Sequence, residues 1–283
     1  MLRLRASHRT EIAYAGVVHD SVNEVRLIPR EDGRQAVEDP YIHVEPATDV
    51  YLHTDAFGNR VAWFQVATPH HRLRIEATAV VTVDPAPPAL APVAWDAFAA
   101  PALRDEVGEY LLESPRVTLS PAVEAFAAEV DAAGSADAVQ WLRHAERTVC
   151  ESIEYQPGST TVDSTVDQLL EARRGVCQDM THLFLALCRR RGIPARYVSG
   201  WLYEPERTSP NESHAWCEVW LPGHGWREFD PTHPEPRLDH YIRVGVGRDY
   251  SDVPPVRGHY VGADTQEMAV TVEIGPAEDP ARR

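Results

Sequence analysis

Lysine is missing from the sequence, and all 27 basic residues among its 283 are arginine. The protein therefore cannot be crosslinked to itself through its own lysine side chains. Basic residues are also outnumbered by 43 acidic ones, which gives a formal charge of −16. Nucleic-acid binders need a basic face to displace phosphate counterions, and anionic membranes attract basic segments. The charge therefore predicts neither a nucleic-acid partner nor a membrane partner.

Long apolar runs are absent as well. No stretch approaches the roughly 20 apolar residues that span a membrane. Residues 1–5 lead straight into polar sequence, without the apolar core and small-residue cleavage site of a signal peptide. We therefore expect a soluble, cytoplasmic protein. A hydrophobic content of 43% is enough for a real core, and 283 residues suggest about two domains.

Cysteine is scarce, with four residues and no CxxC pair. The four are Cys150, Cys177, Cys188 and Cys217. This pattern argues against a disulfide framework and against a structural zinc site. There is also no acidic loop of the EF-hand kind, so we expect neither a metal nor another cofactor. Each cysteine is then either a small packing residue or a reactive thiol.

The first third of the sequence has a β pattern. Residues 73–83 alternate apolar side chains with period two, and residues 55–59 form a hairpin turn between two β-rich runs. Residues 70–71, two histidines, are interpreted as a loop. We therefore predict a small antiparallel β-sandwich over residues 1–84. The proline-rich residues 85–94 then form a linker, because proline at this density cannot continue a sheet.

Beyond the linker the pattern turns helical and then β again. One helix is predicted over residues 121–130, a second after Ser135 as its N-cap, and a third from Thr165, where Thr-Val-Asp-Gln matches a capping box. Strands are expected at 196–203, 215–221, 226–230, 241–246 and 268–274. Helices followed by an antiparallel sheet indicate an α+β fold for residues 95–283.

Cys177 opens a further predicted helix. Its apolar face repeats at helical spacing through Met180, Leu183, Phe184, Leu187 and Cys188. The three arginines at 189–191, followed by Gly192, are typical of a helix end. A helix N-terminus stabilises a thiolate and lowers its pKa from about 8.5, so Cys177 is the candidate nucleophile. Cys150, Cys188 and Cys217 have packing explanations instead.

His214 and Asp230 lie at the two ends of a predicted hairpin. His214 opens one strand, residues 222–225 turn the chain, and Asp230 closes the returning strand. Both residues therefore reach the same edge of a sheet, where a helix N-terminus could bring the thiol. The result is a nucleophile, a base and an orienting acid in the order Cys, His, Asp. The two side chains share a face only if the turn has three or five residues, or an equivalent bulge.

Four segments now resemble the transglutaminase-like core: residues 175–179 (Gly-Val-Cys-Gln-Asp), 192–200 (Gly-Ile-Pro-Ala-Arg-Tyr-Val-Ser-Gly), 213–216 (Ser-His-Ala-Trp) and 229–232 (Phe-Asp-Pro-Thr). Residues 21–30 and 245–257 further resemble its bacterial branch of cysteine proteases, whose members carry a β-rich N-terminal region. The resemblance implies a papain-like fold in which residues 95–283 are the catalytic core and Cys177, His214 and Asp230 are the triad.

The resemblance also implies a reaction, cysteine-dependent acyl transfer at an amide bond of a protein or peptide through a thioester. We favour hydrolysis, because no feature of the sequence would shield the thioester from water. Transamidation of glutamine to a primary amine is the alternative, and a binding module that keeps the fold without turnover is a third interpretation. Tyr155 is a candidate second oxyanion donor beside the Cys177 N–H. Trp201 and Trp216 could line the acyl pocket or belong to the core, and Asp179 is interpreted as compensating the helix dipole.

Overall fold

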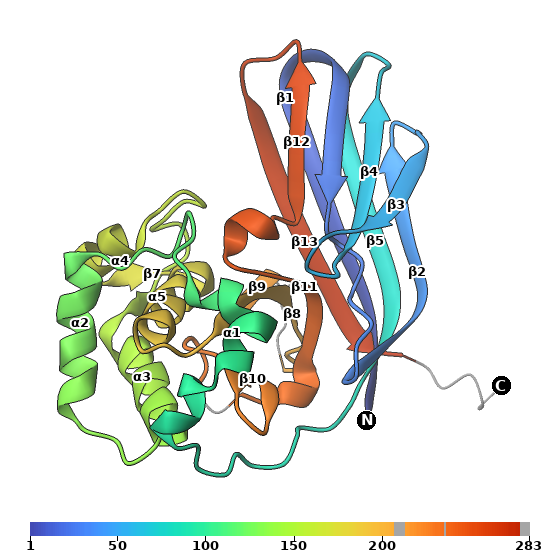
Figure 1. Cartoon of the computed structure of the whole chain (residues 1–283). Coiled ribbons are helices and arrows are strands. Elements are labelled where there is room, and N and C mark those ends of the chain that lie inside the picture. The colour runs from blue at the N-terminus through green and yellow to red at the C-terminus, as the bar shows by residue number, and fades with distance from the viewer. Residues whose placement is uncertain (207–212, 235, 278–283) are drawn as a thin grey trace.

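A computed structural model of the protein describes residues 1–206, 213–234 and 236–277. The chain forms two packed parts, a curled antiparallel β-sheet and a mixed part in which helices cover a four-stranded antiparallel sheet (Figure 1). Strands come first, then helices, then strands again. The α+β class predicted from the sequence is confirmed.

The curled sheet is built around one long strand. Its strands from the first third of the chain are β1 (Leu2–Val25), β2 (Gln35–Glu45), β3 (Val50–Thr54), β4 (Arg60–Val66) and β5 (His70–Val83). The first half of β1 pairs with β5 and the second half with β4. Apolar side chains from both halves, such as Ile12, Phe64 and Leu73, meet in one core. The two halves of the sheet therefore pack on each other.

Two local predictions for this region have different outcomes. Residues 55–59 form the predicted hairpin turn between β3 and β4. The two histidines at 70–71 are not a loop, because β5 starts with them and His70 pairs with Val18. His70 is buried, and its Nδ1 is 2.8 Å from the carbonyl oxygen of Thr68.

The C-terminal strands return to this first sheet. β12 (Val256–Val261) and β13 (Gln266–Pro276) both pair antiparallel with β1, beside which Figure 1 draws them in orange and red. The structure thus differs from the expected division, in which residues 95–283 formed one core. An open edge along a strand as long as β1 would invite pairing with other chains, and the returning strands cover it. Residues 84–94 form a connector without helix or strand, as predicted.

The helices of the second part are α1 (Pro101–Val107), α2 (Pro121–Ala132), α3 (Ala138–Ser152), α4 (Val166–Ala172) and α5 (Cys177–Arg190). The capping box predicted at Thr165 is present, with reciprocal hydrogen bonds between Thr165 and Gln168. The predicted N-cap of α3 was wrong by two residues. Asp137, not Ser135, accepts the N–H groups of Val139 and Gln140, and its charge also favours the positive end of the helix.

The sheet of this part has the strand order β10-β9-β8-β11. Its strands are β8 (Ala195–Leu202), β9 (Ser213–Leu221), β10 (Gly225–Phe229) and β11 (Tyr241–Gly247). A separate parallel pair joins β6 (Glu154–Tyr155) to β7 (Arg174–Gly175). Helix α5 packs on β9 and β8 through an almost wholly buried surface, and its Phe184 stacks on Phe229 of β10. This packing therefore fixes the position of α5, and with it that of Cys177, relative to the strands.

Side-chain amides fasten the two parts together along β11. Gln35 donates to the carbonyl oxygen of Arg243 and accepts from its N–H, at 2.7 and 3.0 Å. Asn59 makes the same pair of hydrogen bonds with Val246, both at 2.8 Å. These amides take the place of a neighbouring strand, so buried backbone groups of β11 are satisfied. The N-terminal sheet is thus attached directly to the sheet that carries the site.

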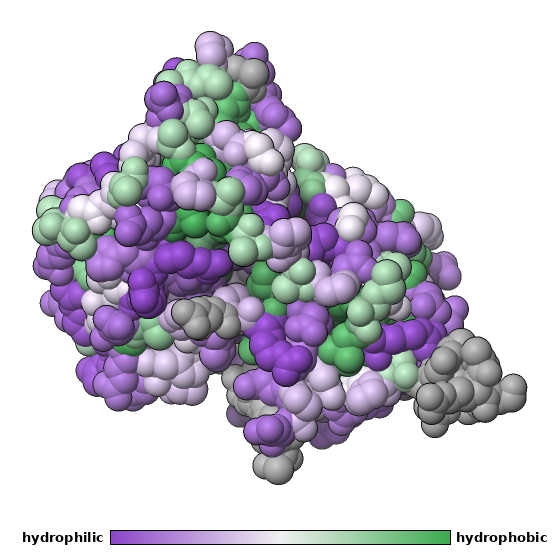
Figure 2. Space-filling model, turned by 90° about the horizontal axis from the view of Figure 1, so that it is seen from below, coloured by the Kyte–Doolittle hydropathy of each residue, from purple (hydrophilic) through white to green (hydrophobic). Residues whose placement is uncertain are grey.

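Polar residues dominate the face of the molecule seen from below, with hydrophobic ones in smaller patches (Figure 2). This agrees with the charge of −16. Within the described ranges, no helix is both long and apolar enough to cross a bilayer.

Replacing Gly200 by alanine is expected to destabilise the fold. A Cβ at this position in β8 would lie 2.2 Å from the carbonyl oxygen of Ile242 and 2.4 Å from the Trp216 ring. Overpacking of this kind costs about 1–3 kcal/mol. Urea unfolding followed by circular dichroism measures the loss. Gly275→Ala in β13 is the matched control, because its Cβ would meet nothing within 4 Å. Equal midpoints for the two variants would contradict the packing described here.

Candidate active site

Cys177 is the first residue of α5, as the sequence predicted. Val176 is the N-cap, and its N–H donates to the carboxylate of Asp179 at 2.9 Å. Thr160 donates to the same carboxylate oxygen at 2.7 Å. Burial raises the pKa of Asp179, and the hydrogen bonds from Val176 and Thr160 act in the opposite direction. Asp179 therefore caps the helix, a structural role in line with the sequence interpretation.

The other three cysteines have settings that suppress reactivity. Cys188 and Cys217 are fully buried, and burial raises the pKa of both thiols. Cys150 is partly buried in α3, where burial and the charge of Asp230 raise its pKa. Cys177 is partly exposed at a helix N-terminus. It alone of the four combines access with the positive end of a helix.

The hairpin that carries the other two candidates has the predicted odd turn. Gly225 pairs with Leu221, so the turn consists of the three residues 222–224. The register continues to the pair Phe229 and Cys217, which places Asp230 one step further, level with Trp216. Residues paired across an antiparallel ladder point to the same face, and Trp216 shares its face with His214. The turn therefore directs Asp230 towards His214.

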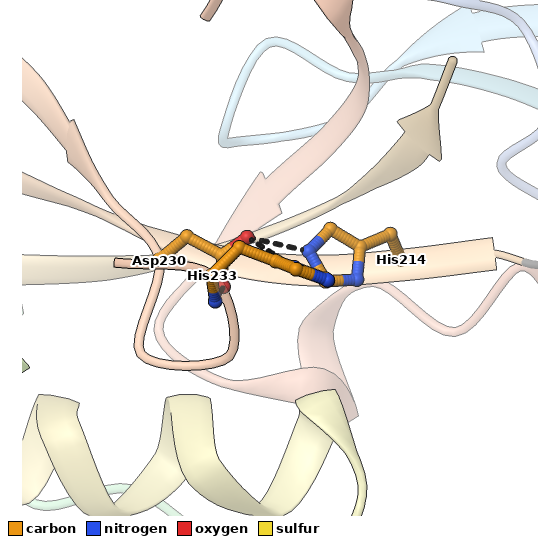
Figure 3. A group of neighbouring side chains, drawn as sticks. All are labelled: His214, Asp230 and His233. Atoms are coloured by element: carbon orange, nitrogen blue, oxygen red, sulfur yellow. Dashed lines mark hydrogen bonds and ion pairs between the residues drawn. The ribbon is translucent and has the colours of Figure 1, made fainter. Parts of the chain in front are cut away.

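His214 and Asp230 are in direct contact. His214 Nε2 lies 2.7 Å from Asp230 Oδ2, and the two residues are 8% and 0% exposed (Figure 3). Burial disfavours the imidazolium, but the charge and hydrogen bond of Asp230 outweigh it, and the interaction with the neighbouring Cys177 thiol also favours the imidazolium. Together they raise the pKa of His214 to about 10. With Nε2 engaged by Asp230, Nδ1 is the nitrogen left for Cys177.

The carboxylate of Asp230 is surrounded by donors. Besides His214, Oδ2 contacts Nδ1 of His233 at 3.2 Å and accepts from the Tyr241 hydroxyl at 2.7 Å. Oδ1 accepts the backbone N–H groups of Thr232 and His233, at 2.9 and 3.3 Å. Burial alone would raise the pKa of Asp230, yet the charge and hydrogen bonds of His214, followed by those of His233, hold that pKa well below its usual range. Asp230 is thus a buried permanent anion.

The sequence analysis missed three residues around this anion: His233, Tyr241 and Glu146. Glu146 of α3 is fully buried, and its Oε1 accepts the backbone N–H of Asp230 at 2.8 Å. Burial raises the pKa of Glu146 to about 7, although the charge of Arg143 opposes the shift. A signal for Glu146 was present, because an acid sits on the apolar stripe of α3 between Leu142 and Val149. Such an acid needs a buried partner.

His214, Asp230 and His233 could also hold a metal ion by the chemistry of their donors. Their ligand atoms all lie within 4.8 Å of one another, and imidazole nitrogen with carboxylate oxygen is a set that zinc accepts. The sequence predicted no metal. An ion bound through His214 Nε2 or Asp230 Oδ2 would have to break the bond that joins these two atoms (Figure 3). Metal binding would therefore compete with the histidine–carboxylate pair.

The structure brings Tyr155 to the site. Tyr155 pairs with Gly175, two residues before Cys177, and is 47% exposed. It lines a cavity of about 280 Å³ together with His214 and Thr232. Tyr155 therefore lies beside His214 in the candidate site.

The two tryptophans belong to the core, the second of the two roles considered for them. Trp216 is fully buried and stacks on His214, with ring centroids 5.9 Å apart. Trp201 is buried between the two parts of the protein, against Leu4 and Ile242. Neither residue lines the cavity beside His214. Trp216 therefore packs against the imidazole from within the core and does not line the cavity.

Comparison with known proteins identifies the family of this chain. Residues 124–231 match the transglutaminase-like superfamily, and residues 4–82 match the bacterial transglutaminase-like N-terminal region. A Mycobacterium leprae protein, uncharacterized protein ML0607, is 35% identical over 280 residues, which cover 97% of this chain and 99% of that one. This chain belongs to the transglutaminase-like superfamily.

Two further similarities involve proteins whose descriptions mention an activity. The crystal structure of a candidate cysteine protease from Cytophaga hutchinsonii matches this transglutaminase-like fold with a TM-score of 0.79, over 98% of this chain and 91% of that chain, at 18% identity. At that identity the likeness confirms the fold. A protein-glutamine gamma-glutamyltransferase of Pseudomonas aeruginosa is 33% identical over 87 residues, 28% of this chain and 13% of that one.

The buried pair predicts a pH-dependent stability for this transglutaminase-like protein. The raised pKa of His214 contributes stability that is complete below its ordinary pKa of about 6.5 and is lost as pH rises towards about 10. The depressed pKa of Asp230 contributes stability above about pH 4 and loses it below. The stability gap between wild type and Asp230→Asn should therefore be largest between about pH 4 and 6.5 and shrink towards pH 10.

Urea unfolding of both proteins across this pH range measures the gap. The control is Asp20→Asn in the exposed pair His19–Asp20, whose side chains also approach to 2.9 Å. An exposed pair contributes little, so its gap should stay near zero at every pH. A gap for Asp230→Asn that does not change with pH would contradict the ion pair.

Proposed function

We propose that this protein is a cysteine-dependent acyl-transfer enzyme that hydrolyses amide bonds of peptide or protein substrates. Cys177 is the nucleophile, His214 is the general base and acid, and Asp230 orients His214. One observation carries the proposal: the imidazole that bonds Asp230 at 2.7 Å is also close enough to Cys177, at the start of α5, for that thiol to raise the pKa of His214. A helix N-terminus and a protonated histidine both favour the thiolate.

The first half of the reaction forms a thioester. The Cys177 thiolate attacks the substrate carbonyl carbon, and the carbonyl oxygen becomes an oxyanion that the Cys177 N–H and the Tyr155 hydroxyl stabilise. The C–N bond then breaks as His214 donates its proton to the leaving amine. The amine departs, and the acyl group stays on sulfur.

The second half returns the enzyme to its starting state. His214, now neutral, takes a proton from a water molecule, whose oxygen attacks the thioester carbonyl. The C–S bond breaks, the carboxylic acid leaves, and Cys177 and His214 regain the thiolate and the proton. Asp230 stays charged throughout and stabilises the imidazolium.

Access of water supports hydrolysis over transamidation. The cavity beside His214 is bordered by Tyr155 and by the half-exposed side chain of His233. Cys177 itself is partly exposed, which favours access of water to a thioester on its sulfur. Transamidation to a primary amine is the second candidate, favoured by the 33% identity over 87 residues to the Pseudomonas glutamyltransferase. The cytoplasmic location and the absence of nucleic-acid and membrane partners stay predictions from composition.

Variants of the triad test the proposal. Cys177→Ala and His214→Ala should each lower turnover by about 10³-fold or more, because triad members act as a unit. Asp230→Asn should retain more activity than either, since it removes only the orienting carboxylate. Mass spectrometry after incubation with a peptide library and a primary amine measures both turnover and the acyl acceptor.

Cys188→Ala is the matched control, because it removes a thiol from the same helix but from its buried face. Products that have gained water support hydrolysis. Products that carry the amine would show that the enzyme is a transamidase and not a hydrolase. Wild-type turnover in purified, folded Cys177→Ala would refute the catalytic proposal itself.

A further inference from the structure

A second cavity, of about 320 Å³, lies between the two parts of the protein. Gln178, Ser213 and Tyr250 line it from the catalytic side. Met268 and Val270 of β13 line it from the N-terminal sheet. The sheet thus supplies one wall of a cavity, and the other wall comes from the part of the protein that carries the candidate active site.

Two residues that line the cavity are sequence neighbours of the reacting residues. Gln178 is the residue after Cys177 in α5, and Ser213 is the residue before His214 in β9. A substrate whose carbonyl carbon met Cys177 would therefore bring a neighbouring part of itself to this cavity. Its volume is at the lower end of the roughly 300–1,000 Å³ of ligand pockets, which suits one side chain more than a folded segment.

The lining of this cavity is free of charge. Among the residues that the structure describes, it includes no aspartate, glutamate or arginine, although the chain carries 70 such residues, 43 acidic and 27 basic. Its one titratable imidazole, His8, is neutral, because burial lowers the pKa of His8 to about 4. A charged group that entered would lose its hydration without gaining an ion partner, which is costly.

Strand β1 has two polar residues on its otherwise apolar inward face where it lines the cavity. The inward face of β1 carries Leu4, Ala6, His8, Thr10 and Ile12, all buried. Leu4 and Ala6 pack against the catalytic sheet, whereas Ile12 packs within the curled sheet. The polar pair His8 and Thr10 falls between these two cores, where it lines the cavity.

Two polar side-chain atoms of His8 and Thr10 lack hydrogen-bond partners among the described residues. His8 Nε2 lies 3.4 Å from the Ser213 hydroxyl, but His8 Nδ1 and Thr10 Oγ1 have no hydrogen-bond partner in the part of the chain that the structure describes. Buried polar atoms without partners cost stability. Both atoms have almost no accessible surface, so they present no hydrogen-bonding group to a molecule in the cavity.

We propose that this cavity binds an uncharged, largely apolar side chain of the substrate, next to the acyl group that reacts with Cys177. The N-terminal sheet is then part of the specificity pocket of the enzyme. This inference rests on the proposed function, because it takes Cys177 as the reacting group.

Active-site-directed probes test the pocket. N-acetyl chloromethyl ketones of leucine, phenylalanine, lysine and glutamate alkylate thiols and differ in one side chain. The rate of Cys177 labelling by each is measured by mass spectrometry and divided by the rate with iodoacetamide, which has no such side chain. The leucine and phenylalanine probes should exceed the charged ones by about tenfold or more, the scale on which apolar pockets discriminate.

A carboxylate in the lining of the cavity should reduce this selectivity for apolar probes. Met268 is 58% exposed, so Met268→Glu should fold, and its carboxylate would border the pocket. The ratio of leucine to lysine labelling should fall by about tenfold in this variant. Leu52→Glu is the matched control, since Leu52 is 63% exposed on β3 of the same sheet but does not line the cavity.

The outcomes separate this inference from the proposed function. Selective iodoacetamide labelling of Cys177 combined with equal rates for all four ketones would overturn the pocket alone. An unchanged leucine-to-lysine ratio in Met268→Glu would do the same. Failure of iodoacetamide to label Cys177 ahead of the three other cysteines would instead remove the proposed function.

Discussion

The buried charge of Asp230 is the constraint on which the site depends. A carboxylate with no exposed surface is tolerated only when its charge and its lone pairs are compensated. Here the compensation comes from several segments: His214 at the start of β9, residues 232–233 after β10, and Tyr241 at the start of β11. Glu146 of α3 holds the Asp230 backbone. The anion therefore holds these segments together, and His214 is positioned as one of its hydrogen-bond partners.

Compensation of buried charge also links the sheet β10-β9-β8-β11 to the N-terminal sheet. Arg243 of β11 is held through its backbone by Gln35, and its guanidinium pairs with Asp32 of the N-terminal part and with the buried carboxylate of Glu228. Glu228 also pairs with Arg34, again across the two parts. Breaking one partner of such a cluster leaves an unpaired buried charge, so the cluster resists separation of the two parts. Strands β12 and β13 add a second attachment, because they leave the catalytic part to pair with β1. A cavity between parts joined so firmly keeps its shape, as a specificity pocket requires.

Sequence reasoning succeeded where the signals were local. The start of α5 at Cys177 followed from an apolar repeat that runs from Met180 to Cys188. The odd turn at 222–224 followed from the need for His214 and Asp230 to share a face. It failed where the cause was distant. The return of residues 256–276 to β1 depends on an edge more than 200 positions earlier in the chain, and no local pattern reports which sheet a strand joins. Tyr241 likewise reads as an ordinary strand residue until the hairpin places Asp230 beside it.

The central claim is that Cys177 carries the acyl group, and trapping that intermediate tests it most directly. A stopped-flow reaction with p-nitrophenyl acetate, followed by acid quench and mass spectrometry of peptides, measures the release of nitrophenolate and the place of the acetyl group. The account predicts a burst of nitrophenolate equal in amount to the protein, with acetyl on the peptide that contains Cys177. Release without a burst, or acetyl on Cys150, Cys188 or Cys217 in place of Cys177, would contradict it.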